Sequence, residues 1–289
     1  MSTLLHQRTN VSECFQPAHE RKDWLAGKHC LITGASSGIG RALAFRAMGL
    51  CRRLTLVSRN TDSKLDNLGQ ELTEFQESAR DLINKTEIKT CTLDVRNYEG
   101  TASLIDRIYN QENECVEAFI NCSGGSHIYG NLETMGSDDI DQIFDVNAKA
   151  PIYWLWNLLP LMKRNSLRAG DLKRAHILML SSRSGERALS RLSVYAAAKG
   201  SIEKLVESLR TEYARFKIVF SLINPGSINT PFTANWSEEA RNAHNAESMD
   251  VESAITPIFM ALNSQFAVNR ISYESTEQWL NEPGVLKPE

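Results

Sequence analysis

The sequence predicts an α/β fold in which a mostly parallel sheet of seven strands carries helices on both faces. Two observations lead to this class. Short apolar runs alternate along the chain with longer segments whose apolar residues recur at helical spacing. A glycine-rich turn also connects the first apolar run to the first helical segment. Strands that alternate with helices form a doubly wound sheet, which binds its ligands at the carboxyl ends of the strands.

The size and composition indicate one large domain. The chain has 289 residues, of which 42% are hydrophobic, and we assign residues 27–289 to a single α/β domain. Residues 1–26 are polar and weakly periodic, so we expect them to form an extension outside the core. The six cysteines form no CxxC pair and the six histidines have no metal-ligand spacing, which predicts neither a disulfide framework nor a metal site.

Charge and hydropathy narrow the possible partners. A net charge of −3 gives no reason to expect binding to nucleic acid. No apolar run reaches about 18 residues, so we expect no membrane span. The first residues lack the apolar stretch of a signal peptide, and we therefore expect a cytoplasmic location.

The expected strands are short apolar runs bounded by polar or turn residues, at residues 29–33, 54–59, 89–95, 118–125, 175–180, 217–226 and 267–273, the last at an edge of the sheet. The expected helices show helical spacing of apolar residues, at residues 41–50, 62–85, 98–110, 137–164, 192–213 and 250–263. Asp250 is a suitable N-cap for the last of them. The polar stretch 232–249, with its single Trp236, is expected to form a mobile lid over the ligand site.

The turn after the first strand favours phosphate binding. Gly34, Gly38 and Gly40 permit a tight turn, a close approach of the backbone to a pyrophosphate, and close packing of the helix on the strand. The exposed amides at the start of the helix favour the phosphate charge. A glycine pattern alone is weak evidence, but this one follows a strand and opens a helix.

The end of the second strand indicates which dinucleotide binds. A free ribose 2′-hydroxyl usually meets an acidic residue at this point, whereas a 2′-phosphate prefers a cation. The chain has Ser58 and Arg59 there and no acidic residue, so NADP(H) is favoured over NAD(H). The alternative is that Arg59 only begins the solvated helix that follows.

The next two strands also end in residues suited to a ligand site. The third ends in Asp94 and Val95, and the fourth in Asn121 followed by a glycine pair that would let a ligand approach the backbone. The long helix that follows contains Asn147, whose short amide is a mediocre helix former. This residue is either exposed, or it interrupts the helix to hold a water.

The stretch around Tyr195 carries the reactive groups. Tyr195 and Lys199 are four residues apart on one helix face, and an adjacent ammonium would lower the pKa of the phenol. Such a phenol is a workable general acid near neutral pH. Ser182 ends the preceding strand, so its hydroxyl can converge on the same pocket. A Tyr and a Lys at this spacing also occur on many solvated helices, and the glycine turn favours a site here.

Taken together, these motifs resemble those of the short-chain dehydrogenase/reductase family in its single-domain form. The resemblance covers roughly residues 27–275. Its motifs are the glycine turn at 33–40, Asp94, the stretch 121–124, Asn147, Ser182, Tyr195 with Lys199, and residues 225–230. The family usually has Asn-Asn-Ala-Gly where this chain has NCSG, which affects local packing more than chemistry. NADP-preferring members often carry a basic residue in the first glycine loop, where Ser37 is not basic, so the choice of cofactor rests on Arg59.

The resemblance implies a Rossmann fold and a role for each site residue. Tyr195 would be the general acid and base, Ser182 would hydrogen-bond the substrate oxygen, and Lys199 would hold the nicotinamide ribose. Asn147 would hold the water of a proton relay. Hydride would reach a carbonyl carbon as Tyr195 protonates the oxygen. The implied NADP contacts are Gly34, Ser36, Ser37, Gly38, Ile39, Gly40, Ser58, Arg59, Asp94, Val95, Asn121, Ser123, Gly124, Tyr195, Lys199, Pro225, Gly226, Ile228 and Thr230.

The substrate is expected to be a small carbonyl compound or alcohol of unspecified identity. Three arginines, at positions 183, 187 and 191, precede Tyr195, and one of them could select an acidic substrate. The alternative is that they are solvated or pair with Glu186 and neighbouring subunits. The expected substrate contacts are His127, Tyr129, Ser182, Arg187 and Trp236.

Other functional classes remain open. A non-catalytic NADP-binding regulator or scaffold would commonly lose the Tyr or Lys that this chain keeps. An epimerase or dehydratase on a related fold is disfavoured by the glycine spacing and the short C-terminal part. The apolar helix with Trp154 and Trp156, and the helix that begins near Tyr195, predict a homodimer or homotetramer.

Overall fold

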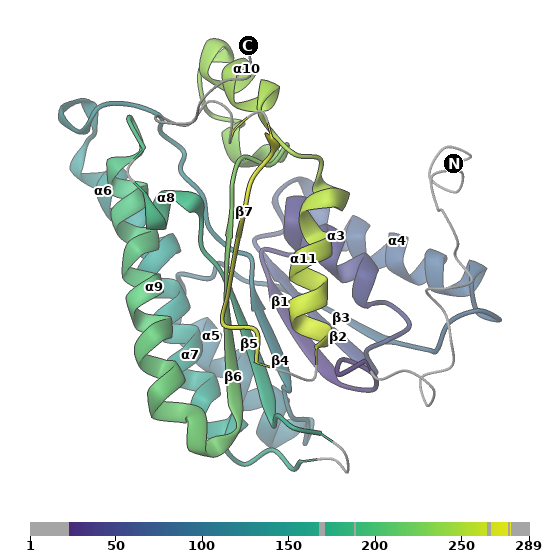
Figure 1. The fold of residues 1–289 in the computed structure, drawn as a ribbon. Helices are drawn as coiled ribbons and strands as arrows, with labels where there is room; N and C mark the ends of the chain where they lie inside the picture. Colours follow the sequence, from purple (N-terminus) through teal and green to yellow (C-terminus); the bar gives the residue numbers. More distant parts are fainter. Residues whose placement is uncertain (1–22, 168–170, 188, 265–266, 277, 279–289) are drawn as a thin grey trace.

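A computed structural model describes residues 23–167, 171–187, 189–264, 267–276 and 278 of the chain. Within these residues the centre is a parallel sheet of seven strands in the order β3-β2-β1-β4-β5-β6-β7 (Figure 1). The strands are β1 His29–Thr33, β2 Arg53–Ser58, β3 Glu87–Thr92, β4 Ala118–Asn121, β5 Ala175–Leu180, β6 Ile218–Pro225 and β7 Arg270–Tyr273. The predicted doubly wound sheet is confirmed, and β7 lies at its edge as expected.

Helices cover both faces of the sheet (Figure 1). One layer consists of α3 Gly38–Ala47, α4 Lys64–Ser78 and α11 Val251–Asn263. The other consists of α5 Tyr98–Asp106, α7 Ala150–Met162 and α9 Ser193–Tyr213. Shorter elements are α6 Ser137–Phe144, α8 Arg183–Glu186, α10 Glu238–Ala246, 3-10 turns at Thr61–Ser63, Leu132–Thr134, Ala214–Phe216 and Pro231–Thr233, and π turns at Arg107–Gln111 and Asp145–Lys149. Among the described helices, none combines the length and the apolar character that crossing a membrane requires.

The central strands are buried on both faces. All five residues of β1, and the first five residues of both β2 and β5, are buried. These strands are therefore mostly apolar along their length, with a few buried polar residues, rather than regular alternations of apolar and polar residues. The order of the strands reverses between β1 and β4, which pair with each other. The carboxyl ends of these two strands border the crevice in which doubly wound sheets bind ligands.

The helix predicted at 62–85 is shorter than expected. It forms α4, Lys64–Ser78, and its start is fixed by Asn60, whose side-chain oxygen accepts hydrogen bonds from the backbone N–H groups of Leu65 and Asp66. A side chain outside the helix thus satisfies two of the amides that a helix N-terminus leaves unpaired.

The helix predicted at 137–164 is present but interrupted. α6 and α7 are separated by the π turn Asp145–Lys149. Asn147 lies in this turn and is fully buried. Of the two alternatives for Asn147, exposure is therefore wrong, and the interruption of the helix is confirmed.

The chain just before the first strand belongs to the core. Trp24 and Leu25 are 1% and 0% exposed, in the same apolar cluster as α3 and α11. The Trp24 indole N–H donates to the Lys173 carbonyl, and the Lys173 ammonium lies 4.3 Å from the centre of the Trp24 ring. The prediction that residues 1–26 lie outside the core is wrong for these two, because a Trp-Leu pair in a polar stretch gives no periodic signal. Residues 1–22 are outside the described residues.

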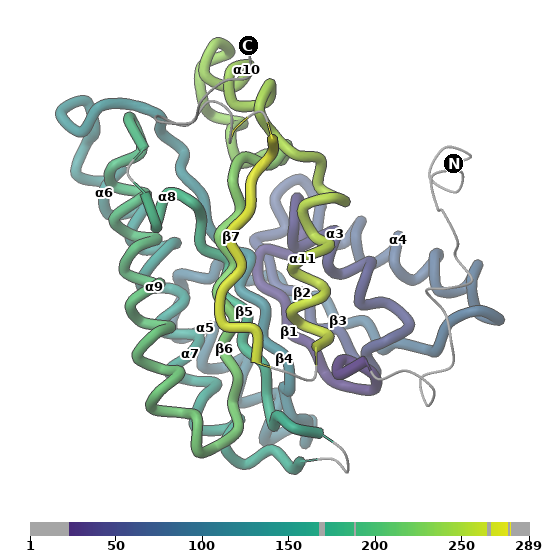
Figure 2. Tube along the Cα trace, in the orientation of Figure 1, coloured from purple at the N-terminus to yellow at the C-terminus, as the bar shows by residue number. Residues whose placement is uncertain are grey.

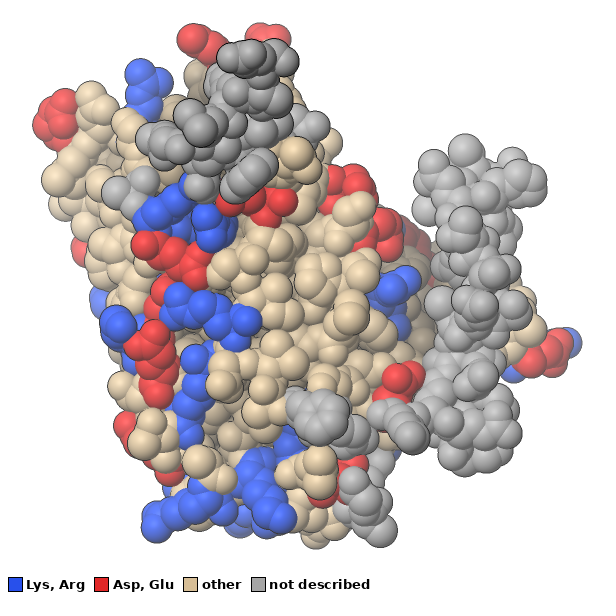
Figure 3. Space-filling model, in the orientation of Figure 1, with Lys and Arg blue, Asp and Glu red and all other residues tan. Residues whose placement is uncertain are grey.

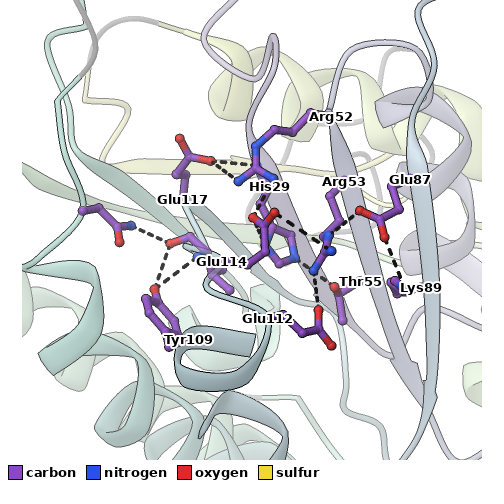
Figure 4. A network of polar contacts seen from close by, with 12 residues as sticks. His29, Arg52, Arg53, Thr55, Glu87, Lys89, Tyr109, Glu112, Glu114 and Glu117 are labelled. Atoms are coloured by element: carbon purple, nitrogen blue, oxygen red, sulfur yellow. Dashed lines mark hydrogen bonds and ion pairs between the residues drawn. The ribbon is translucent and has the colours of Figure 1, made fainter. Parts of the chain in front are cut away.

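Charged side chains join the amino ends of the first three strands (Figure 4). Arg53 bonds Glu87 at 2.8 Å, and Arg52 bonds Glu114 at 2.6 Å. His29 lies among them and is fully buried. Burial, together with the positive charge of the two arginines, lowers the pKa of His29 to about 3, so its imidazole is neutral at pH 7.

The last strand is tied to the layer that contains α9. β7 runs beside β6 (Figure 2). Arg270 on β7 forms ion pairs with Glu186 at 3.0 Å, Glu203 at 3.3 Å and Glu207 at 3.0 Å. Figure 3 shows acidic and basic side chains alternating along this side of the molecule.

Candidate active site

A large cavity opens at the carboxyl ends of the strands. It has a volume of about 740 Å³, and its lining combines the glycine turn after β1 with Ser182, Tyr195 and Lys199. Asn121 is outside the lining; it is buried and accepts hydrogen bonds from two neighbouring hydroxyl groups, at 2.9 Å each. The other residues predicted to contact a dinucleotide all line the cavity, namely Gly34, Ser36, Ser37, Gly38, Ile39, Gly40, Ser58, Arg59, Asp94, Val95, Ser123, Gly124, Tyr195, Lys199, Pro225, Gly226, Ile228 and Thr230.

The glycine turn fits the pyrophosphate of a dinucleotide. Gly34 has a φ of +68°, and a Cβ there would lie 2.7 Å from the backbone nitrogen of Ser123, so a larger residue would push apart β1 and the loop after β4. A Cβ at Gly40 would lie 2.3 Å from the Gly34 carbonyl oxygen. The Ser37 side chain caps no amide of α3, which leaves the first-turn N–H groups available to a phosphate.

The cavity wall beyond β2 presents positive charge. Arg59 is exposed and lines the cavity, as does Lys64 at the start of α4. Asp94 lines it too, but hydrogen bonds from Arg96, the shortest of 2.7 Å, hold the Asp94 carboxylate and lower its pKa. Sequence reasoning missed Lys64; the available signal was a second cation soon after Arg59, at the start of the next helix.

Ser182, Tyr195 and Lys199 come together from a strand end and a helix. Ser182 follows β5 and caps α8, while Tyr195 lies in the first turn of α9 and shares a hydrogen bond with the Ser182 side chain. Lys199 lies one turn further along α9, and its ammonium donates to the Leu180 carbonyl at 2.8 Å. A hydroxyl, a phenol and an amine therefore border the same cavity.

Burial dominates the pKa values of this group. It raises the pKa of the Tyr195 phenol, against the opposing effect of the hydrogen bond with Ser182. It also lowers the pKa of Lys199 to about 8. The prediction that Lys199 lowers the pKa of Tyr195 is therefore wrong here, because the phenolate would lose its hydration while the neighbouring ammonium bonds the Leu180 carbonyl.

Asn147 supports the loop after β4. Its side-chain N–H groups donate to the carbonyls of Gly125 at 2.7 Å and Ile143 at 2.8 Å, and its oxygen accepts from the Gly125 N–H at 3.0 Å. Asn147 is not among the lining residues, but a Cβ at Gly124 would lie 2.8 Å from its oxygen and 3.0 Å from the Lys199 ammonium. Asn147 thus lies next to the reactive groups, and its role in holding a water stays a prediction.

The predicted substrate contacts are only partly brought together. His127 and Trp236 line the cavity, whereas Tyr129 and Arg187 do not. Tyr129 stacks on Trp236 with ring centres 4.6 Å apart and so supports the wall from behind. Arg187 bonds Glu274 at 2.8 Å instead of facing the cavity.

The three arginines before Tyr195 do not form an open anion site. Arg183 lines the cavity, but it pairs with Glu186 and Glu274, each at 3.1 Å. Arg191 is exposed, outside the lining, and lies over the Tyr129 ring. Glu274 also holds Arg187. The alternative that these arginines pair with carboxylates therefore describes Arg183 and Arg187.

The stretch predicted as a lid borders the cavity and contains α10. Trp236 is 7% exposed, and its indole N–H donates to the Ser126 carbonyl at 2.9 Å, which anchors the stretch to the loop after β4. Its mobility stays a prediction. Sequence reasoning missed Leu189, Leu192 and Phe232 as lining residues, although each was an apolar residue in an otherwise polar connection.

Comparisons with known proteins agree with this architecture. Residues 28–241 match the family model described as short chain dehydrogenase. An uncharacterized oxidoreductase of Staphylococcus aureus is 26% identical over 245 residues, which cover 85% of this chain and 95% of that protein. A short-chain type dehydrogenase/reductase from Mycobacterium ulcerans has a similar structure, with a TM-score of 0.73 at 22% identity over 88% of this chain and 91% of that one. An alcohol dehydrogenase from the archaeon Thermococcus sibiricus, complexed with 5-hydroxy-NADP, gives a TM-score of 0.69 at 20% identity over 91% of this chain and 99% of that one.

Proposed function

The chain belongs to the short-chain dehydrogenase/reductase family of oxidoreductases, and from this premise we propose that it interconverts a carbonyl group and a secondary alcohol on a small molecule with NADP(H). One observation carries the proposal. A single cavity is lined both by the glycine turn at Gly34 and by Ser182, Tyr195 and Lys199. A dinucleotide on the glycine turn would therefore extend toward a phenol able to exchange a proton with the substrate.

The residues of the cavity define where NADP(H) would bind. The glycine turn and the first amides of α3 would hold the pyrophosphate. Arg59 and Lys64 would face the 2′-phosphate, and this pair of cations supports NADP(H) over NAD(H). The 5-hydroxy-NADP in the Thermococcus sibiricus alcohol dehydrogenase is consistent with this choice in a protein of the same fold. Lys199 would hold the hydroxyl groups of the nicotinamide ribose.

The protein's own groups would handle the proton. The bound nicotinamide supplies or accepts the hydride. During reduction, Tyr195 donates its phenolic proton to the substrate oxygen as negative charge develops there, and Ser182 donates a hydrogen bond to the same oxygen. The raised pKa of Tyr195 keeps the phenol protonated at neutral pH, which a proton donor requires. Asn147 would keep the loop at Gly125 in place beside Lys199.

The test is a screen of neutral and charged ketones with NADPH, and of secondary alcohols with NADP+. The absorbance of NADPH reports turnover in both directions. We expect turnover with at least one compound, and loss of that turnover in Tyr195→Phe. The alternative is a non-catalytic NADP-binding regulator or scaffold. Such a protein would bind NADPH but would not oxidise it with any of the compounds. Equal turnover in wild type and Tyr195→Phe would contradict the proposed mechanism.

We also propose a homodimer or homotetramer. On α7, Trp154 is fully buried and stacks on Phe119, so it belongs to the core rather than to an interface. Ile152, Tyr153 and Trp156 on the same helix are 42%, 38% and 61% exposed, and they form an apolar surface of the kind that mediates association. A cytoplasmic location stays a prediction.

A further inference from the structure

The part of the cavity beside Tyr195 has apolar walls from two segments. Leu189 and Leu192 come from the connection between α8 and α9, and Phe232 and Trp236 come from the stretch after β6. The Phe232 ring lies 5.5 Å from the Tyr195 ring, centre to centre. The surface nearest the reactive phenol is therefore aromatic and aliphatic.

The aromatic wall is held by several contacts within the protein. Trp236 stacks on Tyr129, meets Phe232 edge to face at 5.4 Å, and donates its indole N–H to the Ser126 carbonyl. His244 of α10 packs against the Trp236 ring at 5.6 Å. Stacking, edge contacts and a buried hydrogen bond fix the ring from several sides, so the wall exists before a substrate arrives.

Polar and charged side chains in this part of the cavity already have partners within the protein. Arg183 pairs with Glu186 and Glu274, and the imidazole of His127 bonds the Asp139 carboxylate at 3.0 Å. Burial lowers the pKa of His244, which leaves it uncharged at pH 7. The Lys199 ammonium donates to the Leu180 carbonyl.

A charged substrate would bind poorly among such groups. A carboxylate on the substrate would lose its hydration and would have to compete with Glu186 and Glu274 for the Arg183 guanidinium. An ammonium would meet apolar walls and the guanidinium of Arg183. The walls favour a neutral molecule.

The contacts that hold these walls in place also favour a ring as the substrate body. A flexible chain loses internal rotation when it is held between fixed side chains, whereas a ring buries a similar apolar area with little rotation to lose. Flat contacts with Phe232 and Trp236 add to this preference, because aromatic faces bind other ring faces well.

This inference rests on the proposed function and deepens it: we propose that the substrate is a neutral ketone, or the matching secondary alcohol, whose body is an apolar ring held against Phe232 and Trp236. Trp236 is then a specificity-determining residue. It sets the position of the wall through its bond to Ser126, and it contacts the ring directly.

The test uses the full chain saturated with NADPH and three matched ketones. Cyclohexyl methyl ketone and methyl hexyl ketone have the same carbon count and the same reacting group, and differ in the ring. A ring-carboxylated cyclohexyl methyl ketone adds the negative charge. We expect kcat/KM for the neutral cyclic ketone to exceed that of the open-chain ketone by about tenfold, and that of the carboxylate by about a hundredfold. Comparable values for the cyclic ketone and either competitor would overturn the inference.

Variants assign the preference to Trp236. Trp236→Ala should remove most of the difference between cyclic and open-chain ketones, whereas Trp236→Phe should keep part of it, because an aromatic face remains although the bond to Ser126 that positions the wall is lost. Met260→Ala, an exposed position on α11, is the matched control and should leave the ratio unchanged. A ratio that survives in Trp236→Ala would contradict the role of this residue.

Dissociation constants of the three ketones, measured by calorimetry on the NADPH-saturated protein, separate the two proposals. If the ketones bind with the expected order but none oxidises NADPH, the proposed function is wrong and the ring preference stands. If NADPH is oxidised with all three at similar kcat/KM and similar affinity, the proposed function stands and the ring preference is wrong. If Trp236→Ala does not fold, the role of Trp236 is tested with Trp236→Phe, and the ring preference is tested with the three ketones on the wild-type protein.

Discussion

The Lys199 ammonium lies 5.7 Å from the centre of the Tyr195 ring and bonds the Leu180 carbonyl. Both side chains are almost fully buried, at 3% and 6% exposure. The two groups therefore act on each other across a short distance from which water is largely excluded. Each can be tested separately, because only the tyrosine is proposed to transfer a proton and only the lysine is proposed to bind the ribose.

Removal of the Tyr195 hydroxyl should abolish most turnover and leave NADPH binding intact. In Tyr195→Phe we expect kcat to fall by about 100-fold or more, the usual contribution of a general acid. Tyr129→Phe is the control, because its phenol lies outside the cavity lining and should change kcat little. Stopped-flow rates and a fluorescence titration of NADPH provide both readouts. A kcat close to the wild-type value in Tyr195→Phe would rule out the proposed acid.

The charge of Lys199 should make NADPH binding depend on pH. Its pKa is lowered to about 8, so the ammonium is present below this pH and is lost above it. We expect NADPH affinity to weaken above about pH 8, by about tenfold, the equivalent of one lost charge-assisted hydrogen bond. Lys199→Met should bind NADPH weakly at every pH and show no such step. Parallel pH dependence in the two proteins would count against Lys199 as a ligand of the coenzyme.

Arg59 should give the site a preference for NADPH over NADH of roughly 2 kcal/mol, the scale of a charge-assisted interaction with the 2′-phosphate. Arg59→Ala should lose much of this preference for NADPH. Lys64→Ala should lose a smaller part of the preference, because Lys64 also pairs with Asp62. Arg46→Ala removes a cation outside the lining and serves as the control. Fluorescence titration of both coenzymes measures the preference. Equal affinities in the wild-type protein would place Arg59 in solvent.

The exposed side chains of α7 should hold subunits together. Trp156 is 61% exposed and stacks on Tyr98, and among the residues that the structure describes its other face is uncovered. Light scattering at micromolar concentration should give the mass of a dimer or tetramer, and Trp156→Glu should lower it by placing a charge in the apolar contact. Met260→Glu alters a side chain of similar exposure on another helix and should leave the mass unchanged. A monomeric wild-type mass would refute the proposed assembly.

The buried His29 should destabilise the protein in acid. Its pKa falls from 6.5 in the unfolded chain to about 3 in the folded one, so between these values only the unfolded chain binds the proton. The free energy of unfolding should therefore fall as pH decreases across this window, by up to about 1.4 kcal/mol per pH unit from this group. His29→Gln, which has no proton to bind, should show a shallower fall in urea unfolding. An unchanged slope would mean that His29 is protonated in the folded state.

The sequence predicted the centre of the sheet well because the central strands are buried on both faces. The bounds of β1 and β5 match the short apolar runs from which they were predicted. Edge regions were harder to predict. The end of α4 at Ser78 depends on how the chain turns back to β3, and no local pattern records that turn.

The reactive groups were also predictable, because Tyr195 and Lys199 share a helix face and Ser182 ends a strand that points to it. The partner of Arg187 was not, since Glu274 is 87 residues away and only the folded chain brings them together. The predicted direction of the Tyr195 pKa shift was wrong for a similar reason. Helical spacing gives the distance between two groups, but the burial that governs their ionisation is set by the whole fold.

Trp24 lies ahead of Lys28, the first residue of the family match, and this matters for anyone who produces the protein. A shortened version that starts at Lys28 would lack the ring that covers the Lys173 ammonium. Loss of a buried Trp costs about 3–5 kcal/mol, a large share of the stability of an ordinary domain. Poor yield or inactivity of such a truncated version would then reflect lost packing around Trp24. It would say nothing about the residues at the carboxyl ends of the strands, where the chemistry is proposed to occur.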